Sequence, residues 1–335
     1  MPKSLAEEHQ ELFHYTGIGG LEGILRTQML RATHAAYLND TTELYAFRER
    51  LPGILAPSVE NGVNNVLKRN PEKRSIVENQ GGITSVRDVI SAQLSELIYS
   101  TLNGTIDSPP FVEPFIVSFC TTKSPSIAKS GLLSQWRGYG KEGGYAIVFD
   151  TARLSDLIVE EGKKEECDLF GGDVLYSSAN DDRFRDEFGD DTSILQTSIE
   201  NYFSSDGAPS SLEATYHPVM RCACRYKHWG FEEEAEVRVV SIPNSKVILQ
   251  AAAAEGIAAK TINIEHFSRG GLLVPCIYLF KNVTSISGRL LPIKRIIVGP
   301  HKDKIKRKHS IENLLYSLNL TIPVSVSEIP YVELS

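Results

Sequence analysis

Short runs of β-forming residues are scattered along this chain among helical segments of uneven length. Two of the clearest are Phe115–Cys120, which follows several prolines, and Ile293–Val298, which ends at a Gly-Pro pair. Apolar runs of this length and composition are typical of buried strands. Because the strands do not alternate regularly with helices and the chain has no internal repeat, the pattern favours an α+β fold over a doubly wound parallel sheet.

A long polar stretch with helical periodicity precedes Phe115–Cys120. We interpret residues 43–110 as a helical insertion within a single domain that spans residues 1–335. Proline and glycine interrupt helices, so breaks are expected at Pro52, Pro57, Pro71 and Gly81-Gly82. The acidic stretch from Asp181 to Asp191 is expected to be a loop or a short helix start.

The composition indicates a globular protein with no strong general attraction for nucleic acid. The 335 residues are 41% hydrophobic, which is ample for a core, and the formal net charge is −7. Such a charge argues against an unaided electrostatic grip on a phosphate backbone, although a local basic strip could still exist. The one basic run, Lys302–Lys308, is typical of a solvated helix face.

The chain carries none of the signals of export or membrane insertion. Its N-terminal segment lacks the basic and apolar regions of a signal peptide, and no apolar run reaches membrane-spanning length. Five cysteines, an odd number, are widely scattered, which fits reduced thiols. We therefore expect a cytoplasmic protein without a membrane partner or a disulfide framework.

Several familiar enzyme motifs are incomplete or absent. Gly17-Ile18-Gly19-Gly20 follows a strand but lacks the full dinucleotide-binding fingerprint, and neither a phosphate-loop lysine signature nor a Gly-x-Ser-x-Gly elbow occurs. Cys120 and Cys276 sit in apolar runs that would raise the thiol pKa and make them inert.

Zinc is considered and set aside. His217, Cys222, Cys224 and His228 lie within twelve residues and could supply ligands, but Cys-Ala-Cys in a regular strand does not wrap one ion. We interpret the two cysteines as half-buried thiols on a strand and predict no metal.

A glycine-punctuated segment, Ser134–Gly140, feeds the strand-like run Tyr145–Phe149. It gathers a glutamine, a tryptophan, an arginine and a tyrosine, a composition typical of sites built on loops over rigid sheets. The alternative is a turn in which Trp136 fills the core and Arg137 pairs with a buried carboxylate.

The segment Phe231–Arg238 places four carboxylates before an arginine. We expect a strand from Glu234 to Ser241 with Glu234 and Glu236 on one face, where their repulsion is costly unless a cation or ligand hydroxyls use them. The alternatives are a solvated acidic face and a structural pairing of Arg238 with either acid.

Six short motifs occur in a fixed order along the chain. The first three are Phe13-His14-Tyr15-Thr16, Tyr37-Leu38-Asn39-Asp40 and Leu133–Gly140. The fourth is the set Lys227, Phe231, Glu234, Glu236 and Arg238, and the last two are Ile296–Pro300 and Ile329-Pro330. In this order they resemble a bacterial family catalogued as domain of unknown function 2971. The resemblance runs from about Leu12 to Tyr331, which is nearly the whole chain.

That family resembles, more remotely, the ADP-ribosyltransferase fold, in which a split mixed sheet clamps NAD. The resemblance implies such a sheet here and matches three signature positions to His14, to Tyr139 or Tyr145, and to Glu236. The pair Glu234 and Glu236 also resembles the Glu-x-Glu form of some of these transferases, but the serine or threonine expected with that form is not clearly placed.

The resemblance implies a role for each residue type. Cleavage between nicotinamide and ribose passes through an oxocarbenium-like state, which a carboxylate stabilises more than it stabilises the ground state. Glu236 would supply that carboxylate, and Glu234 would orient the acceptor or act as a base. Ribose, nicotinamide and pyrophosphate would be held by a cofactor-binding set of His14, Tyr15, Gln135, Arg137, Tyr139 and Tyr145.

We therefore expect an NAD-dependent glycosyltransferase of the ADP-ribosyltransferase type, with a macromolecular acceptor that is RNA, DNA or protein. By analogy it would serve as a toxin or in antiviral defence, restrained by a neutralising or regulatory protein. The alternatives are an NAD glycohydrolase, which uses water as the acceptor, and a non-catalytic module that binds a nucleotide or a protein.

Overall fold

The computed structural model describes residues 4–38, 43–103, 114–139, 143–165, 167–205, 207–242, 253–256, 262–281 and 290–330. Within them, ten strands form one mixed sheet: β1 (Glu11–Thr16), β2 (Leu30–His34), β3 (Phe115–Cys120), β4 (Tyr145–Asp150), β5 (Asp168–Asp173), β8 (Glu236–Ile242), β9 (Glu265–Arg269), β10 (Leu272–Leu279), β11 (Ile293–Val298) and β12 (Val324–Val326). A small parallel sheet joins β6 (Leu175–Tyr176) to β7 (Tyr226–Lys227).

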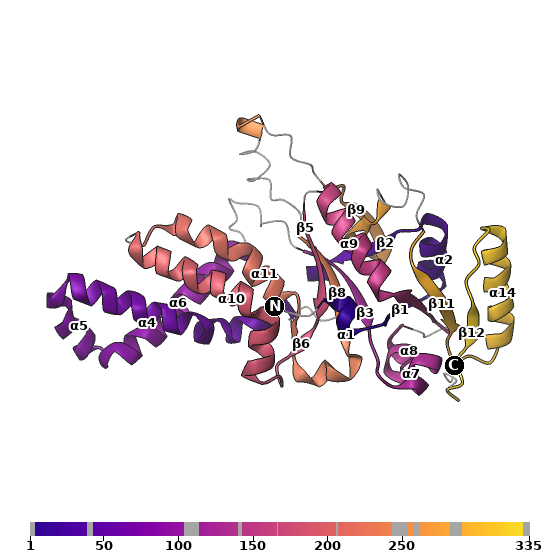
Figure 1. Cartoon of the computed structure of the whole chain (residues 1–335), viewed down its shortest axis with the longest axis horizontal. Coiled ribbons are helices and arrows are strands. Elements are labelled where there is room, and N and C mark those ends of the chain that lie inside the picture. Colours follow the sequence, from indigo (N-terminus) through magenta and orange to yellow (C-terminus); the bar gives the residue numbers. More distant parts are fainter. Residues whose placement is uncertain are drawn as a thin grey trace.

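Helices flank the sheet and extend beyond it (Figure 1). They are α1 (Leu5–Glu8), α2 (Ile18–Thr27), α3 (Glu43–Ala46), α4 (Leu51–Arg69), α5 (Arg74–Asn79), α6 (Gly82–Asn103), α7 (Pro125–Ser130), α8 (Leu133–Tyr139), α9 (Thr151–Glu165), α10 (Asp181–Ser204), α11 (Tyr216–Ala223) and α14 (Lys304–Ser317). The α+β prediction is confirmed, whereas a sheet of the ADP-ribosyltransferase type and a single domain over residues 1–335 remain predictions.

The sheet forks at its central strand, β3. One edge of β3 pairs with β8 along the whole strand. The other edge pairs with β2 at Phe115 and Ile116 and, in the described residues, with β1 at Cys120 alone. From there β1 leads to β4, β11 and β12, whereas β2 leads to β10 and β9. The two branches therefore diverge beside Val117–Phe119.

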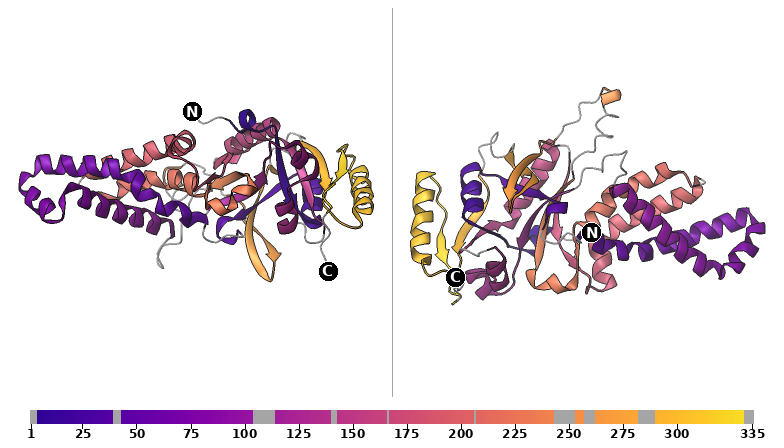
Figure 2. Two further views of the ribbon diagram at one scale, coloured as in Figure 1. Left: turned by 90° about the horizontal axis from the view of Figure 1, so that it is seen from below. Right: turned by 180° about the vertical axis from the view of Figure 1, so that it is seen from behind.

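The predicted insertion is helical wherever it is described. Helices α4 and α6 pack with α10 and α11 into a lobe that extends from one end of the sheet (Figures 1 and 2), while residues 104–110 lie outside the described ones. The expected break at Gly81-Gly82 is confirmed, since both glycines have positive φ between α5 and α6. Pro57 is instead inside α4, on an exposed turn where water can reach the carbonyl it leaves unpaired.

Alternation along β3 and β8 assigns each face of the sheet to a different core. Val117, Phe119, Val237 and Val239 face a core with α2, α9 and α14. On the opposite face, Ile116, Val240 and Ile242 pack under the helical lobe, and Phe13, Tyr15 and Cys120 pack with Trp136 of α8. The polar residues of β3 and β8 lie between these last two clusters.

Two local predictions are wrong, and a third is right in only one of its alternatives. Asp181–Asp191 is a helix start rather than a loop, and it opens the 24-residue helix α10 with Asn180 as its N-cap. Ser134–Tyr139 forms part of α8 rather than a loop, with Gly140 outside the described residues. Cys222 and Cys224 lie on and just after α11 rather than on a strand, and both are buried in the lobe.

No helix in the described part of the chain has both the length and the hydrophobicity needed to cross a bilayer.

Candidate functional site

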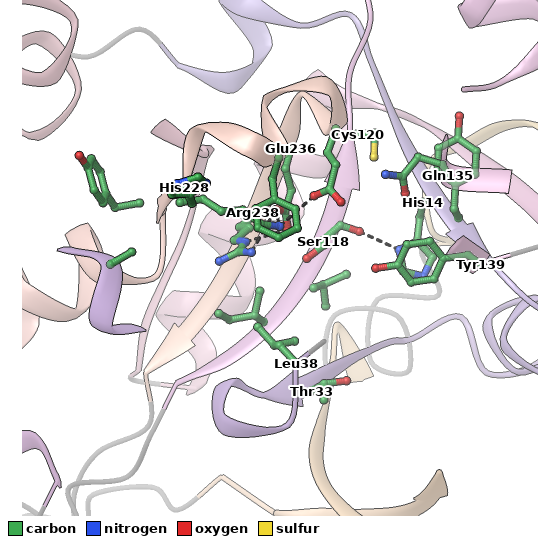
Figure 3. A pocket seen from close by; sticks show the side chains of 18 of the residues that line it. His14, Thr33, Leu38, Ser118, Cys120, Gln135, Tyr139, His228, Glu236 and Arg238 are labelled. Atoms are coloured by element: carbon green, nitrogen blue, oxygen red, sulfur yellow. Dashed lines mark hydrogen bonds and ion pairs between the residues drawn. The ribbon is translucent and has the colours of Figure 1, made fainter. Parts of the chain in front are cut away.

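A cavity of about 980 Å³ opens over the polar stretch of the forked sheet. Ser118 of β3 and Glu236 and Arg238 of β8 line its floor. Ala46 of α3 and Tyr139 of α8 also line it, and Figure 3 shows Tyr139 beside His14. The predicted alternation of β8 is confirmed here, since its valines enter the core while its charged residues face the cavity.

Glu236 is a buried carboxylate that several donors surround. It accepts hydrogen bonds from Nε and Nη2 of Arg238 at 2.8 and 3.0 Å, from Nζ of Lys227 at 3.1 Å, and from the Ser118 side chain. Burial alone would raise the pKa of Glu236, but the two cations and the hydrogen bonds outweigh it and lower the pKa to about 2. Glu236 is therefore ionised at neutral pH, and both of its oxygens already accept hydrogen bonds.

Glu234 is the second carboxylate, and it is more accessible. It ends the 3₁₀-helix Trp229–Glu234, and its Oε2 lies 2.8 Å from Nζ of Lys227. The strand begins at Glu236 rather than at Glu234, because Ala235 adopts a left-handed conformation with φ 42°. The two acids nevertheless meet at Lys227, which lies 4.5 Å from the centre of the Phe231 ring.

The left-handed Ala235 is a strained element beside the site. A residue with a Cβ in this conformation costs about 1–2 kcal/mol. Its neighbours hold it in place, since Thr121 N–H donates to the Ala235 carbonyl and Val174 N–H donates to the Glu236 carbonyl, both at 2.9 Å. Ala235 therefore stands between Glu234, which ends the 3₁₀-helix, and Glu236, which begins β8.

His14 fills the fork of the sheet. Its Nδ1 lies 3.0 Å from the Ser118 carbonyl. A carbonyl can only accept, so Nδ1 carries the hydrogen and Nε2 is left as an acceptor. Burial, opposed by this hydrogen bond and reinforced by the charge of Arg31, lowers the pKa of His14 below its ordinary value. The ring is therefore neutral at pH 7.

Cys120 also lines the cavity. Burial, together with the charges of Glu236 and Glu234, raises the pKa of its thiol. The direction of this shift agrees with the sequence-based expectation, and the inertness of the thiol stays a prediction.

Gln135 places an amide in the cavity wall. The residue is 5% exposed, and it lines the cavity. Figure 3 shows it near His14 and Tyr139, on the opposite side of Ser118 from Glu236. An amide offers both donors and an acceptor, so this wall can bond a polar ligand.

The described residues contain one group whose side chains could meet at a metal ion. Ligand atoms of Glu8, His9 and Asp173 all lie within 4.8 Å of one another. However, His9 already bonds Asp173 at 2.7 Å and the Thr121 hydroxyl at 3.0 Å, and the group lies outside the cavity lining. We assign no metal to it.

The structure brings six of the eight predicted site residues to the cavity: Glu236, Glu234, His14, Tyr15, Gln135 and Tyr139. The hydroxyl of Tyr15 is directed to Leu132 N–H at 2.8 Å, and its ring packs against Trp136. Two predicted residues are elsewhere. Tyr145 is buried in the core on the opposite face of the sheet, and Arg137 is exposed on α8 outside the cavity lining.

Sequence reasoning missed several cavity residues. Arg31 of β2, Ser118 and Arg269 of β9 were not singled out, because each depends on strands far apart in the chain. One usable signal existed. In Leu30–Thr33 and in Phe115–Cys120, Arg31 and Ser118 are the polar interruptions of otherwise strand-like runs, and such interruptions mark a face that is not core.

Comparison with known proteins gives one finding. Residues 135–239 match the profile of a family described as "protein of unknown function (DUF2971)". This range contains Glu234 and Glu236 but is shorter than the expected Leu12–Tyr331, and it leaves out His14. No curated protein and no solved structure matches the chain. None of the comparisons links it to ADP-ribosyltransferases, so that likeness remains a hypothesis.

Proposed function

We propose that this chain cleaves NAD and transfers ADP-ribose to a macromolecular acceptor. One observation carries the proposal: a carboxylate ionised at neutral pH, Glu236, lies in a cavity with the more accessible carboxylate of Glu234 and the neutral imidazole of His14. Cleavage of a ribosyl bond develops positive charge on the sugar, and a fixed carboxylate stabilises that charge.

The three groups suit separate tasks in this reaction. The Glu236 carboxylate would accept a hydrogen bond from a ribose hydroxyl and offset the oxocarbenium charge. His14 Nε2, free of a proton, would accept from another hydroxyl. Glu234, partly exposed, would take the proton of the acceptor as it attacks. Gln135 would bond the carboxamide of nicotinamide, and Tyr139 would contact its ring.

The hydrogen bonds that Glu236 already accepts from Arg238 and Lys227 set a condition on this mechanism. Because both oxygens of Glu236 already accept hydrogen bonds from cations, a ribose hydroxyl must compete with one of these donors. Lys227 is the donor that can leave at least cost, because its bond to Glu236 is the longest of the three measured and Glu234 offers it another carboxylate at 2.8 Å. Substrate binding is then expected to move Lys227 toward Glu234.

The same pairing of Glu236 with Arg238 and Lys227 favours one alternative. In it, the chain is a non-catalytic module that binds a nucleotide in this cavity, and Glu236 serves only as the acid of a structural ion pair. An NAD glycohydrolase with water as the acceptor is a variant of the leading proposal. The acceptor class, a role as a toxin or in antiviral defence, a neutralising partner and a cytoplasmic location are parts of the proposal that rest on the resemblance alone.

The deciding experiment is nicotinamide release from NAD by the purified chain, alone and with RNA, DNA or protein added separately. Release that needs one acceptor class supports the transferase and identifies that class. Release without an acceptor supports the glycohydrolase. Binding of NAD without release supports the non-catalytic module, and neither binding nor release would contradict the whole proposal.

A further inference from the structure

Charge is distributed unevenly in the cavity. At the Glu236 end, Arg238 and Lys227 are neutralised by Glu236 and Glu234. Two further arginines that line the cavity, Arg31 and Arg269, pair with no carboxylate among the described residues. The cavity therefore has a balanced end and a cationic end.

The two arginines come from different strands but approach the same place. The guanidinium of Arg31 lies 3.7 Å from the centre of the Phe267 ring. Phe267 and Arg269 are two residues apart on β9, so their side chains leave the same face of the strand. The strand itself is part of the β9–β10 hairpin that projects from the body of the molecule (Figure 2, left).

Both guanidinium groups are held before any ligand arrives. The guanidinium of Arg31 makes a cation–π contact with Phe267, and Nη2 of Arg269 donates to the backbone carbonyl of Tyr37. An arginine fixed in this way loses less side-chain entropy when it binds an anion. Each retains N–H groups that no described residue accepts.

The cationic end is continuous with the candidate catalytic groups. The Ser118 side chain hydrogen-bonds Glu236, the Ser118 carbonyl accepts from His14, and the charge of Arg31 acts on His14. In the sheet, β8 with Glu236 is followed by β3 with Ser118 and then by the two branches, β1 with His14 and β2 with Arg31. A ligand with a sugar at His14 would present its next group to Arg31.

We infer that Arg31 and Arg269 bind the diphosphate group of the nucleotide substrate. Two forked guanidinium groups without carboxylate partners match the charge and the oxygen geometry of a diphosphate. The inference rests on the proposed function, names the residues that recognise the substrate in that cavity, and replaces Arg137, which the sequence suggested for this role.

The test compares substitutions in the purified full-length chain. Binding of ADP-ribose and of inorganic pyrophosphate is measured by calorimetry for the native chain, Arg31→Gln, Arg269→Gln and Arg137→Gln as a matched control. Each cavity substitution is expected to weaken ADP-ribose binding by about 10- to 100-fold, because a charge-assisted pair is lost, whereas Arg137→Gln should have no effect. Arg31→Lys keeps the charge without the fork and should fall between native and Arg31→Gln.

The outcomes separate this inference from the proposed function. Native-like binding of ADP-ribose by folded Arg31→Gln and Arg269→Gln would overturn the inference even if the chain releases nicotinamide. Loss of binding in these two variants alone would support the inference even if no nicotinamide is ever released. Adenosine, which lacks phosphate, should bind all five chains equally, and a loss of adenosine binding in the Arg31 or Arg269 variants would also count against a diphosphate site.

Discussion

Two carboxylates in this molecule are held by the same kind of partners in different surroundings. Glu11 of β1 accepts both Nη atoms of Arg295 at 2.6 and 2.7 Å and also pairs with Lys294 at 2.8 Å. Hydrogen bonds from Arg295 outweigh burial and lower the pKa of Glu11 to about 2. Glu236 has the same arrangement, one arginine and one lysine, and its pKa is lowered equally far.

The surroundings distinguish them. Glu11 ties β1 to β11 across β4 and lies outside the cavity lining. Glu236 faces the cavity, follows a strained residue and has a second carboxylate within reach of its lysine. A lowered pKa and an ion pair therefore do not mark a site by themselves. Glu236 differs because it faces a cavity that a substrate can enter and because a second acid, Glu234, competes for its lysine.

Replacing each of the two glutamates by glutamine should give the largest difference between them, in the rate of nicotinamide release. We expect Glu236→Gln to lower the rate of nicotinamide release by at least about 100-fold, the usual effect of losing one electrostatic contact to the transition state. Glu11→Gln should change the rate by less than about twofold. Initial rates at saturating NAD measure both.

A folding control is needed, because removing one partner of a buried ion pair costs about 3–5 kcal/mol. Circular dichroism at the assay temperature establishes that Glu236→Gln is folded. Glu236→Asp keeps the charge and most of the pairing but withdraws the carboxylate, so it should be stable and still slow. Equal rates for the Glu236 and Glu11 variants would remove the distinction drawn between the two sites.

Glu234→Gln should give a smaller and more selective effect. If Glu234 acts on the acceptor, transfer of ADP-ribose should fall by about 10- to 100-fold while release of nicotinamide to water falls less. Both rates are measured in one reaction with labelled NAD. Equal losses in the two rates would show that Glu234 acts on NAD cleavage and not on the acceptor.

The lowered pKa values of Glu11 and Glu236 should make the free energy of unfolding depend on pH in the acid range. A carboxyl group whose pKa is lowered by folding stabilises the protein above its unfolded pKa and loses that contribution as the pH falls toward the folded value. The free energy of unfolding should therefore decline from about pH 4.5 to about pH 2. In urea titrations, Glu11→Gln should remove about 1 kcal/mol of this decline, since solvent screens a partly exposed pair. An unchanged slope would contradict the pairing.

Ala235→Gly should produce the smallest change. Glycine adopts positive φ without strain, so the substitution should stabilise the chain by about 0.5–1 kcal/mol after the greater chain entropy of glycine is allowed for. Thermal unfolding measures the gain. Gly23→Ala, in α2 with open space around its Cβ position, is a control for glycine and alanine exchange without left-handed strain. Destabilisation by Ala235→Gly would mean that its methyl group makes contacts worth more than the strain.

Local pattern was sufficient to predict much of the secondary structure. The strand predictions at Phe115–Cys120 and Ile293–Val298 are confirmed. Six consecutive apolar residues rich in β-branched and aromatic side chains are enough to indicate a strand. At Asp181 the sequence left a loop and a short helix start open, and the length of α10 was missed, because its charged first turn obscures the apolar stripe of Phe184, Phe188 and Leu195 that packs in the lobe. The left-handed conformation of Ala235 could not be predicted, because the sequence has no glycine or asparagine at that point.

The candidate site divides along similar lines. Glu236 and Arg238 were accessible to reasoning, because their alternation with valines fixes the face they share. Arg31 and Arg269 were not, because they meet only after β2 pairs with β10. Arg137 and Tyr145 were misplaced for the converse reason, since adjacency in the chain to Gln135 and Tyr139 does not imply a shared direction in space.

The fork of the sheet also has a consequence during synthesis. Its central strand, completed by Cys120, pairs with β8, which follows more than a hundred residues later, and the second arginine of the cationic end is at position 269. Pairing across such a separation closes a long loop and is intrinsically slow. A ribosome-bound chain therefore carries the early half of the cavity exposed and inert for most of translation. Whatever chemistry the cavity performs is withheld until the chain has folded around it.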